Sequence, residues 1–235
     1  MSLPSFPVKK ILILLILLAV PGTLYYLLKE KGQNRYRPLN IYGEKKVAST
    51  FHTKRGKQIP DTIYHVIRDF SLLNQNSDAI KFPADSNQIT VVNFFYTRCP
   101  LLCRDMNKDL ARVAKMYNNN RLMRFISISV DPDYDSPEVL AEYSKPYISE
   151  NKKWDFLTGD KDLIYSLAKK DFMVDAIADT IGKINIIHSP MLILIDPQKR
   201  IRGYYDSSLG HEQVTLLSDE IKLFITEELR GIKVS

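Results

Sequence analysis

The longest apolar stretch of the chain runs from Ile11 to Leu28, eighteen residues without a charged side chain. As a helix rising about 1.5 Å per residue it would reach roughly 27 Å, close to the ~30 Å hydrocarbon core of a bilayer. Tyr25 and Tyr26 lie near its outer end, where aromatic side chains favour the membrane interface. The stretch is apolar on every face, which argues against a helix buried in a folded core. We therefore expect residues 11–28 to be a transmembrane signal anchor.

A cleaved signal peptide is the alternative for this stretch. No small-residue cleavage site follows Val20, and no cysteine follows the stretch to carry a lipid. If residues 11–28 are instead a retained anchor, residues 1–10 are a short cytoplasmic segment and the chain after residue 28 lies outside the cytoplasm. Because the N-terminus lacks the Arg- and Ser-rich character of a mitochondrial transit peptide, we expect a bacterial cell membrane protein with a periplasmic C-terminal domain. The polar and basic residues 29–60 favour a tether.

From residue 61 onward the pattern is that of a folded domain. Residues 63–76 alternate enough for a short strand or hairpin. The β-branched and aromatic stretch 88–97 (QITVVNFFYT) predicts a central strand buried on both faces, and 122–131 predicts a second. Residues 191–196 and 201–206 read as a strand, a turn and a strand.

Apolar residues at helical spacing alternate with these strands. They predict helices over 101–117, 136–147, 160–172 and 211–229. The second of these begins with a Ser cap at Ser136 and a proline at Pro137. The order of strands and helices is that of an α/β sheet with an antiparallel finish, so we expect one domain over 61–235.

Composition and charge limit the classes of function that the chain could have. The chain is 45% hydrophobic, enough for a core that needs no disulfide. Its formal net charge is +6, but the basic residues are spread along the chain without a long run. We therefore expect no nucleic-acid binding, and a solvated basic surface that tolerates acidic partners or anionic lipid.

The chain has two cysteines, Cys99 and Cys103, placed between the strand 88–97 and the helix that follows it. Partial positive charge at a helix N-terminus lowers the pKa of a thiol, so we expect thiolates to form there. Residues four apart lie on one face of a helix, about 6 Å between Cα atoms, which suits a disulfide and a shared metal ion equally well. A disulfide closing so short a loop would add little stability.

A third ligand would favour the metal. His52 and His65 precede the core, and His211 begins the last helix, where a surface role is the default. His188 lies directly before the strand 191–196, and loops at strand ends are where open α/β sheets place their sites. Two thiolates and an imidazole suit copper, and three ligands leave the ion exchangeable. Structural zinc normally takes four.

Four segments in order, VVNFFYTRCPLLC, FISISVDPDYDSPEVLAEY, WDFLTGD and HSPMLILIDPQKRIRGYYD, resemble the Sco/SenC family. The likeness runs from about Arg68 to Asp206. It implies a thioredoxin-like sheet flanked by helices, preceded by one membrane helix. It also implies Cu(I) or Cu(II) held by Cys99, Cys103 and His188. The implied partners are a copper donor protein and the copper-bearing subunit of cytochrome c oxidase, whose CuA centre would receive the metal.

The sequence departs from the family pattern at three positions. Arg104 stands where many members have a second proline, Ile187 where many have an acid before the histidine, and Arg68 where a proline often occurs. The site becomes more cationic, which affects copper affinity more than ligand identity. Asp131 matches a family acid and is expected to form a turn. The likeness also predicts a cis peptide bond between Ser189 and Pro190.

Two functions follow from these residues. The first is a membrane-anchored copper chaperone that helps assemble the CuA centre. The second is a membrane-anchored thiol-disulfide reductase acting on extracytoplasmic cysteines, the enzyme reading, in which Cys99 and Cys103 are catalytic. The reductase requires an exposed, thiolate-prone Cys99 and does not depend on His188, whereas the chaperone requires His188 as a ligand.

Overall fold

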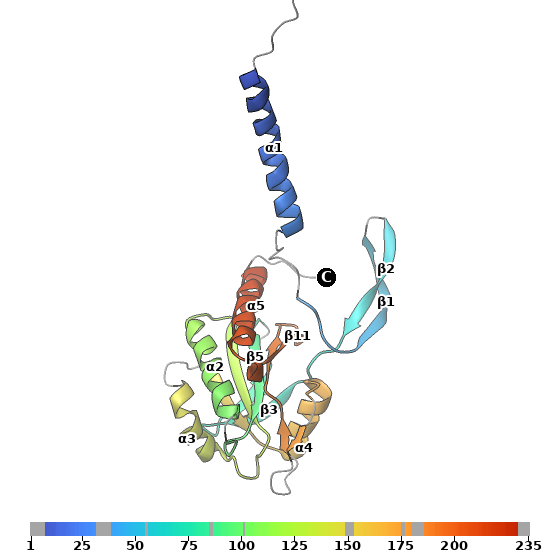
Figure 1. Ribbon diagram of the computed structural model, residues 1–235. Helices are drawn as coiled ribbons and strands as arrows, with labels where there is room; N and C mark the ends of the chain where they lie inside the picture. The colour runs from blue at the N-terminus through green and yellow to red at the C-terminus, as the bar shows by residue number, and fades with distance from the viewer. Residues whose placement is uncertain are drawn as a thin grey trace, which may run out of the picture. The chain divides into compact units, whose positions relative to one another are not determined.

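The computed structural model describes residues 8–31, 39–54, 56–84, 87–100, 102–148, 153–174, 177–179 and 186–229. The chain divides into two compact units, Met1–Pro38 and Leu39–Ser235. The first unit contains helix α1 (Val8–Lys31), and the second contains a sheet, its covering helices and both cysteines (Figure 1).

Helix α1 forms over the apolar stretch at the N-terminus, as the sequence predicts. Its apolar side chains surround the helix, and those of residues 12–18 are all more than half exposed. Among the helices that the structure describes, none is both long enough and apolar enough to cross a membrane. The transmembrane anchor therefore stays a prediction.

A seven-stranded sheet forms the centre of the second unit, in the order β11-β10-β5-β6-β7-β3-β4. The strands are β3 (Phe70–Asn74), β4 (Ala79–Phe82), β5 (Ile89–Phe95), β6 (Met123–Ser129), β7 (Trp154–Thr158), β10 (Met191–Ile195) and β11 (Ile201–Asp206). The three central strands β5, β6 and β7 are parallel, whereas β10–β11 and β3–β4 pair antiparallel at the edges. Every residue of β5 and β6 is buried, as their long apolar stretches predict.

Helical segments cover both faces of the sheet. They are α2 (Leu102–Met116), α3 (Pro137–Ile148), α4 (Lys161–Ser166), the π-helical turn η1 (Leu167–Asp171), the 3₁₀ turn η2 (Ser207–Leu209) and α5 (His211–Leu229). Phe95 stacks on Tyr143 of α3, whereas Phe94 packs edge-on against Phe172, just after η1, both at 5.2 Å between ring centroids. Because successive strand residues point to opposite faces, α3 and η1 lie on opposite sides of the sheet. Helix α2 packs beside α3 and α5.

Two antiparallel hairpins complete the second unit. One pairs β1 (Lys45–Lys54) with β2 (Lys57–Tyr64), and the other pairs β8 (Ile177–Asp179) with β9 (Ile186–His188). The first hairpin occupies much of the stretch 29–60, for which the sequence favours a tether. Strand β2 continues past residue 61, where the sequence analysis places the start of the folded domain. Most side chains of this hairpin are exposed, so its strands need few apolar residues. Residues 45–60 therefore lack the apolar pattern by which a buried strand is recognised in a sequence.

Most predicted elements form where the pattern places them, with two differences. The expected order omits β7, whose five residues are too few to show a clear period. The cis peptide bond expected before Pro190 is wrong: in the described part of the chain the cis bond is Phe82–Pro83. Pro190 keeps the trans form that most X–Pro bonds favour, and its carbonyl accepts the N–H of Ser207 at 3.0 Å.

Candidate metal centre

Three loops meet at one edge of the sheet. Because β5 and β6 are parallel, the segments that follow Phe95 and Ser129 leave the sheet at the same edge. Strand β10 is antiparallel to β5, so the chain enters β10 at that edge too. The first segment carries Cys99, the second carries three aspartates, and the third follows His188. The topology thus gathers the predicted site residues from distant parts of the sequence.

The two cysteines lie together where α2 begins. The N–H of Cys99 donates to the carbonyl of Tyr96 at 3.2 Å, which turns the chain after β5. The N–H of Cys103 then donates to Sγ of Cys99 at 3.3 Å. Both cysteines are reduced, with no disulfide between them, and both are buried. The four-residue spacing therefore places the sulfur of Cys99, which lies before α2, against the backbone of Cys103.

The pKa of Cys103 is raised well above its ordinary value. The hydrogen bond with Cys99 is the largest cause, and burial of the thiol is the second. The expectation that the helix N-terminus lowers the pKa is wrong for Cys103, because these two effects outweigh the partial positive charge of the helix end. The raised pKa favours the protonated thiol of Cys103.

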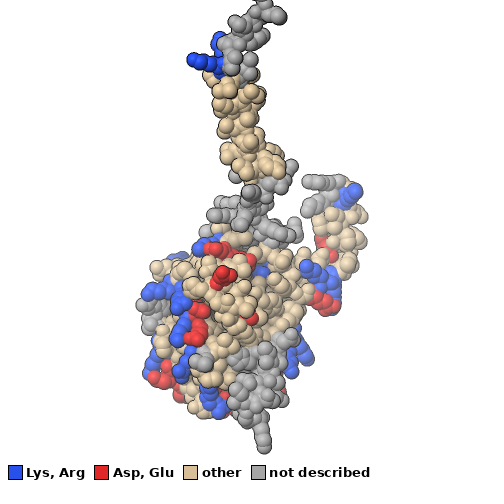
Figure 2. Space-filling model, in the orientation of Figure 1, with Lys and Arg blue, Asp and Glu red and all other residues tan. Residues whose placement is uncertain are grey.

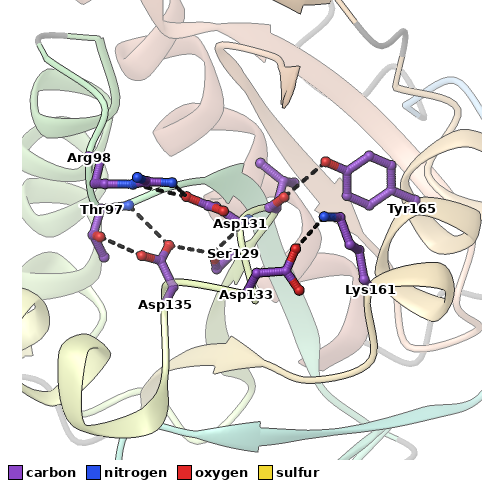
Figure 3. A network of polar contacts seen from close by, with 9 residues as sticks. Thr97, Arg98, Ser129, Asp131, Asp133, Asp135, Lys161 and Tyr165 are labelled. Carbon is purple, nitrogen blue, oxygen red and sulfur yellow. Dashed lines mark hydrogen bonds and ion pairs between the residues drawn. The ribbon is translucent and has the colours of Figure 1, made fainter. Parts of the chain in front are cut away.

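A buried carboxylate fixes the residues in front of Cys99 (Figure 3). Asp135, fully buried in the turn after β6, accepts the N–H of Thr97 at 3.1 Å and its hydroxyl hydrogen as well. The hydroxyl of Ser129 donates to the same carboxylate. Burial raises the pKa of Asp135, against the lowering effect of the hydrogen bonds from Ser129 and Thr97. The turn after β6 therefore holds the loop that carries Cys99.

A second aspartate of that turn holds the residue directly before Cys99. Nε of Arg98 donates to Asp131 at 3.1 Å, and Nη2 donates to the same carboxylate oxygen. The guanidinium also lies 4.3 Å from the ring centroid of Tyr134. Asp131 is buried, whereas about half of the Arg98 side chain is exposed. Arg98 therefore places positive charge at the solvent side of the cysteine loop, balanced by Asp131 beneath it.

The turn after β6 is also held by two contacts with α4 (Figure 3). Lys161, at the start of α4, pairs with Asp133, and the hydroxyl of Tyr165 donates to the carbonyl of Val130 at 3.1 Å. The aspartate turn is thus held between the cysteine loop and α4.

Helix α2 is tied to the sheet by a chain of buried hydrogen bonds. Asn107, one turn after Cys103, donates to the hydroxyl of Tyr143 at 3.1 Å and accepts from Asn93 of β5 at 2.9 Å. Ser127 donates to Asn93 at 2.6 Å, and Trp154 donates to Ser127 at 2.9 Å. These contacts fix the helix that carries one cysteine against the strand that leads to the other.

For the third predicted ligand, His188, the structure describes the position of the backbone. His188 ends β9, where it pairs with Ile177, and residues of β9 and β5 approach within 8 Å at their Cα atoms. The side chain of His188 lies outside the described residues. Within the described side chains, no three His, Cys, Asp or Glu residues form a ligand set for a metal ion.

The segment after His188 borders open space. The lining of a pocket of about 590 Å³ includes Ser189, Pro190, Met191, Met173 and Tyr204. The start of β10 is therefore not enclosed by packed core.

The other three histidines have these places in the fold. His52, in β1, pairs with Asp61 at 2.7 Å, and Nε2 of His65 is hydrogen-bonded to the carbonyl oxygen of Asp171 at 2.7 Å. His211 begins α5, as expected.

Sequence reasoning misses Thr97 and Asp135. The usable signal is the run SVDPDYDSP, in which two aspartates four residues apart follow a buried strand. A polar turn at the carboxyl end of one parallel strand lies beside the turn that follows its neighbour, so the run predicts contact with the cysteine loop.

The donor set fits a soft cation better than a hard one. Two adjacent buried thiols offer sulfur ligands, which Cu(I) prefers, whereas calcium and magnesium require oxygen ligands. Metal binding would release the thiol protons, because a coordinating sulfur is deprotonated.

Comparison with known proteins agrees with this architecture. A SCO2-like protein of Rickettsia typhi is 28% identical over 222 residues, which cover 91% of this chain and 98% of the relative. The solved structure of BsSco, described as a member of the Sco family of cytochrome c oxidase assembly proteins with a disulfide switch, matches with a TM-score of 0.57 and 23% identity, covering 68% of this chain and 94% of that one.

Arabidopsis thaliana ScoI, solved with copper bound, matches with a TM-score of 0.55 and 24% identity, covering 71% of this chain and 99% of that one. These likenesses show the α/β, thioredoxin-like Sco fold, with a sheet flanked by helices. The SCO1/SenC family model matches residues 60–221, a span that includes both cysteines and His188. The chain therefore belongs to the SCO1/SenC family.

Proposed function

We propose that this protein is a copper chaperone that binds copper through Cys99, Cys103 and His188. The observation that carries the proposal is the contact between the N–H of Cys103 and Sγ of Cys99, which brings two reduced, buried thiols together at the start of α2. The copper-bound relative and the family membership support copper as the cargo. Delivery would be to the copper-bearing subunit of cytochrome c oxidase, after loading by a copper donor protein.

The geometry suits a site that releases its ion. Two sulfurs and one imidazole leave the coordination of copper open to a ligand from the receiving protein. The ordered cysteine loop reduces the reorganisation that binding requires, since Asp135 and Asp131 already hold Thr97 and Arg98. Because binding displaces the proton of Cys103, copper affinity should rise with pH.

The test is an anaerobic Cu(I) titration of the reduced protein against a competing chelator. His188→Ala should weaken binding by at least tenfold, as expected for loss of one of three ligands. His52→Ala is the matched control, because this histidine is ion-paired on the β1–β2 hairpin. Equal affinities for His188→Ala, His52→Ala and the native chain would exclude the three-ligand site.

We also infer that residues 11–28 hold the domain at a bacterial cell membrane, with the second unit on the periplasmic side. The support is the apolar surface that surrounds α1. In a flotation assay the full chain should float with lipid vesicles in high salt and at alkaline pH. Recovery of the full chain in the soluble fraction under these conditions would refute the anchor.

A thiol-disulfide reductase is the second candidate. The observation that favours it is the one-turn spacing of the cysteines, which a disulfide can close, together with the disulfide switch reported for BsSco. The burial of both cysteines opposes it, because disulfide exchange starts with an accessible thiolate. Reduction of an oxidised dicysteine peptide that is unaffected by His188→Ala would favour the reductase.

A further inference from the structure

The β1–β2 hairpin carries apolar side chains on an exposed face. Phe51 lies opposite Pro60, and Val47 lies opposite Thr62. Residues 60 and 62 are two apart on β2 and share a face, so Val47 and Phe51 lie together on that face. Val47 is 78% exposed and Phe51 is 60% exposed.

The opposite face of the hairpin is also partly apolar. Ile59 and Ile63 are four residues apart on β2 and share a face, and Ile63 is 56% exposed. Asp61 lies between them along β2, and its carboxylate is hydrogen-bonded to Nδ1 of His52 at 2.7 Å. The hairpin therefore presents apolar residues to its surroundings on both faces.

Both strands of the hairpin pack mainly on each other. In the part of the chain that the structure describes, no other helix or strand contacts β1 or β2 extensively. Figure 1 shows the hairpin projecting from the rest of the second unit. A two-stranded hairpin is marginally stable in water, and clustered exposed apolar side chains mark interaction surfaces. The hairpin is thus a surface that gains stability from a partner.

Charge indicates the chemistry of that partner. Lys45, Lys46 and Lys57 are exposed, with the first two at one end of the hairpin and Lys57 near the other. Figure 2 shows Lys and Arg atoms near both ends of the hairpin, with Asp or Glu atoms between the ends and at the base. The one carboxylate within the two strands, Asp61, is already paired with His52. Lys46 pairs with Glu44, the residue directly before β1, at 3.2 Å. The three lysines outnumber the two carboxylates Glu44 and Asp61, so these five residues carry a net positive charge.

We propose that the β1–β2 hairpin binds the surface of a membrane that contains anionic lipid. Val47 and Phe51 would enter the interface between headgroups and acyl chains, while the lysines contact anionic headgroups. Apolar burial combined with cationic attraction is the general basis of interfacial binding. This inference rests on the membrane location proposed above but not on copper binding, so copper titrations are unaffected by its failure.

The experiment places a tryptophan at the apolar face of the full chain. Phe51→Trp is compared with Leu209→Trp, since Leu209 is also apolar and 69% exposed but lies in η2. The single native tryptophan, Trp154, is buried in the core and gives a constant background. Each variant is mixed with vesicles of phosphatidylcholine, with or without phosphatidylglycerol, whose acyl chains carry bromine as a quencher.

We expect the emission of Phe51→Trp to shift to the blue and to be quenched at least about twofold more than that of Leu209→Trp, with stronger quenching when phosphatidylglycerol is present. Replacing Lys45, Lys46 and Lys57 by Gln should remove the dependence on phosphatidylglycerol, because each lysine near an anionic surface changes affinity by about fivefold.

Three results would overturn the proposal. The first is equal quenching of Phe51→Trp and Leu209→Trp in chains that float with the vesicles. The second is a chain that does not associate with anionic vesicles at all. The third is a blue shift of Phe51→Trp that depends on protein concentration without lipid, which would assign this face to a second copy of the chain.

Discussion

The carboxylate of Asp135 accepts both hydrogen-bond donors of Thr97, its backbone N–H at 3.1 Å and its hydroxyl. Thr97 is two residues before Cys99, and Asp135 is thirty-eight residues further along the chain from Thr97. The position of the cysteine loop is therefore set by a turn that belongs to the neighbouring strand.

Removal of this carboxylate should weaken copper binding. Asp135→Ala leaves the Thr97 donors without their acceptor, and loss of such supporting hydrogen bonds typically costs about 10–100-fold in metal affinity. Asp135→Asn should retain most of the affinity, because its amide can accept from the N–H of Thr97 and donate to the hydroxyl oxygen. A competition titration with Cu(I) measures both variants.

The matched control for this series is Asp133→Ala. Asp133 lies in the same turn but pairs with the exposed Lys161. Circular dichroism checks that each variant is folded. The supporting role is refuted if Asp135→Ala, while folded, binds Cu(I) as tightly as Asp133→Ala.

The pH dependence of stability should report the same residue. Because burial raises the pKa of Asp135, the folded chain binds this proton more tightly than the unfolded chain does. The resulting stability is fully present below the ordinary pKa of 3.8 and is lost as the pH rises through the raised folded pKa. Asp135→Asn carries no such proton, so the native chain should lose stability relative to this variant across that range.

Thermal unfolding of both proteins from acid to neutral pH tests this expectation. Asp105→Asn is the control, since Asp105 is exposed on α2 and pairs with Lys108. A difference between the native chain and Asp135→Asn that stays constant with pH, as for the control, would show that Asp135 does not titrate in this way.

Much of this arrangement follows from the sequence, and the reason is periodicity. The stretch 88–97 predicts β5 because it is rich in β-branched and aromatic residues with few polar breaks, and the residues around Cys103 predict α2 because their apolar side chains recur at helical spacing. Cys99 follows β5, Cys103 lies in the first turn of α2, and His188 lies shortly before β10, so local pattern is enough to propose these candidate ligands.

The hydrophobic pattern of the sequence does not predict contacts between residues that are distant along the chain. No local period links Thr97 to Asp135, since their contact depends on β5 and β6 being parallel neighbours. The raised pKa of Cys103 could not be predicted from the sequence for a related reason. The sequence shows that Cys103 lies near a helix N-terminus, but the burial of the thiol and its contact with Cys99, which raise the pKa, depend on how the chain packs.

The thiols should react slowly in the native, reduced protein. Cys99 is 3% exposed and Cys103 is 2% exposed, and the raised pKa of Cys103 keeps its thiolate rare. We expect alkylation by iodoacetamide at neutral pH to be at least about tenfold slower than in urea-unfolded protein. Leu209→Cys, introduced into a chain with both native cysteines replaced by Ser, gives the rate of an exposed thiol. Native alkylation as fast as this reference would instead favour the reductase.

The buried hydrogen bonds of Asn107 should be a large part of the stability of the site. Asn107→Leu keeps the approximate size of the side chain but leaves the amide of Asn93 and the hydroxyl of Tyr143 without this partner in the core. Each buried polar group left unsatisfied costs about 1–3 kcal/mol, so we expect a loss of about 2–4 kcal/mol in the free energy of unfolding. Urea unfolding followed by Trp154 fluorescence measures it.

Trp154 is a suitable probe because it ends the same chain of hydrogen bonds, through Ser127 and Asn93. Asn119→Leu is the control: Asn119 is exposed beyond the end of α2, and surface changes of this kind usually stay within about 0.5 kcal/mol. If Asn107→Leu changes stability no more than this control, the hydrogen bonds do not hold α2 to the sheet. A loss confined to Asn107→Leu, accompanied by weaker Cu(I) binding, would show that the helix carrying Cys103 is positioned through the core as well as through the aspartate turn.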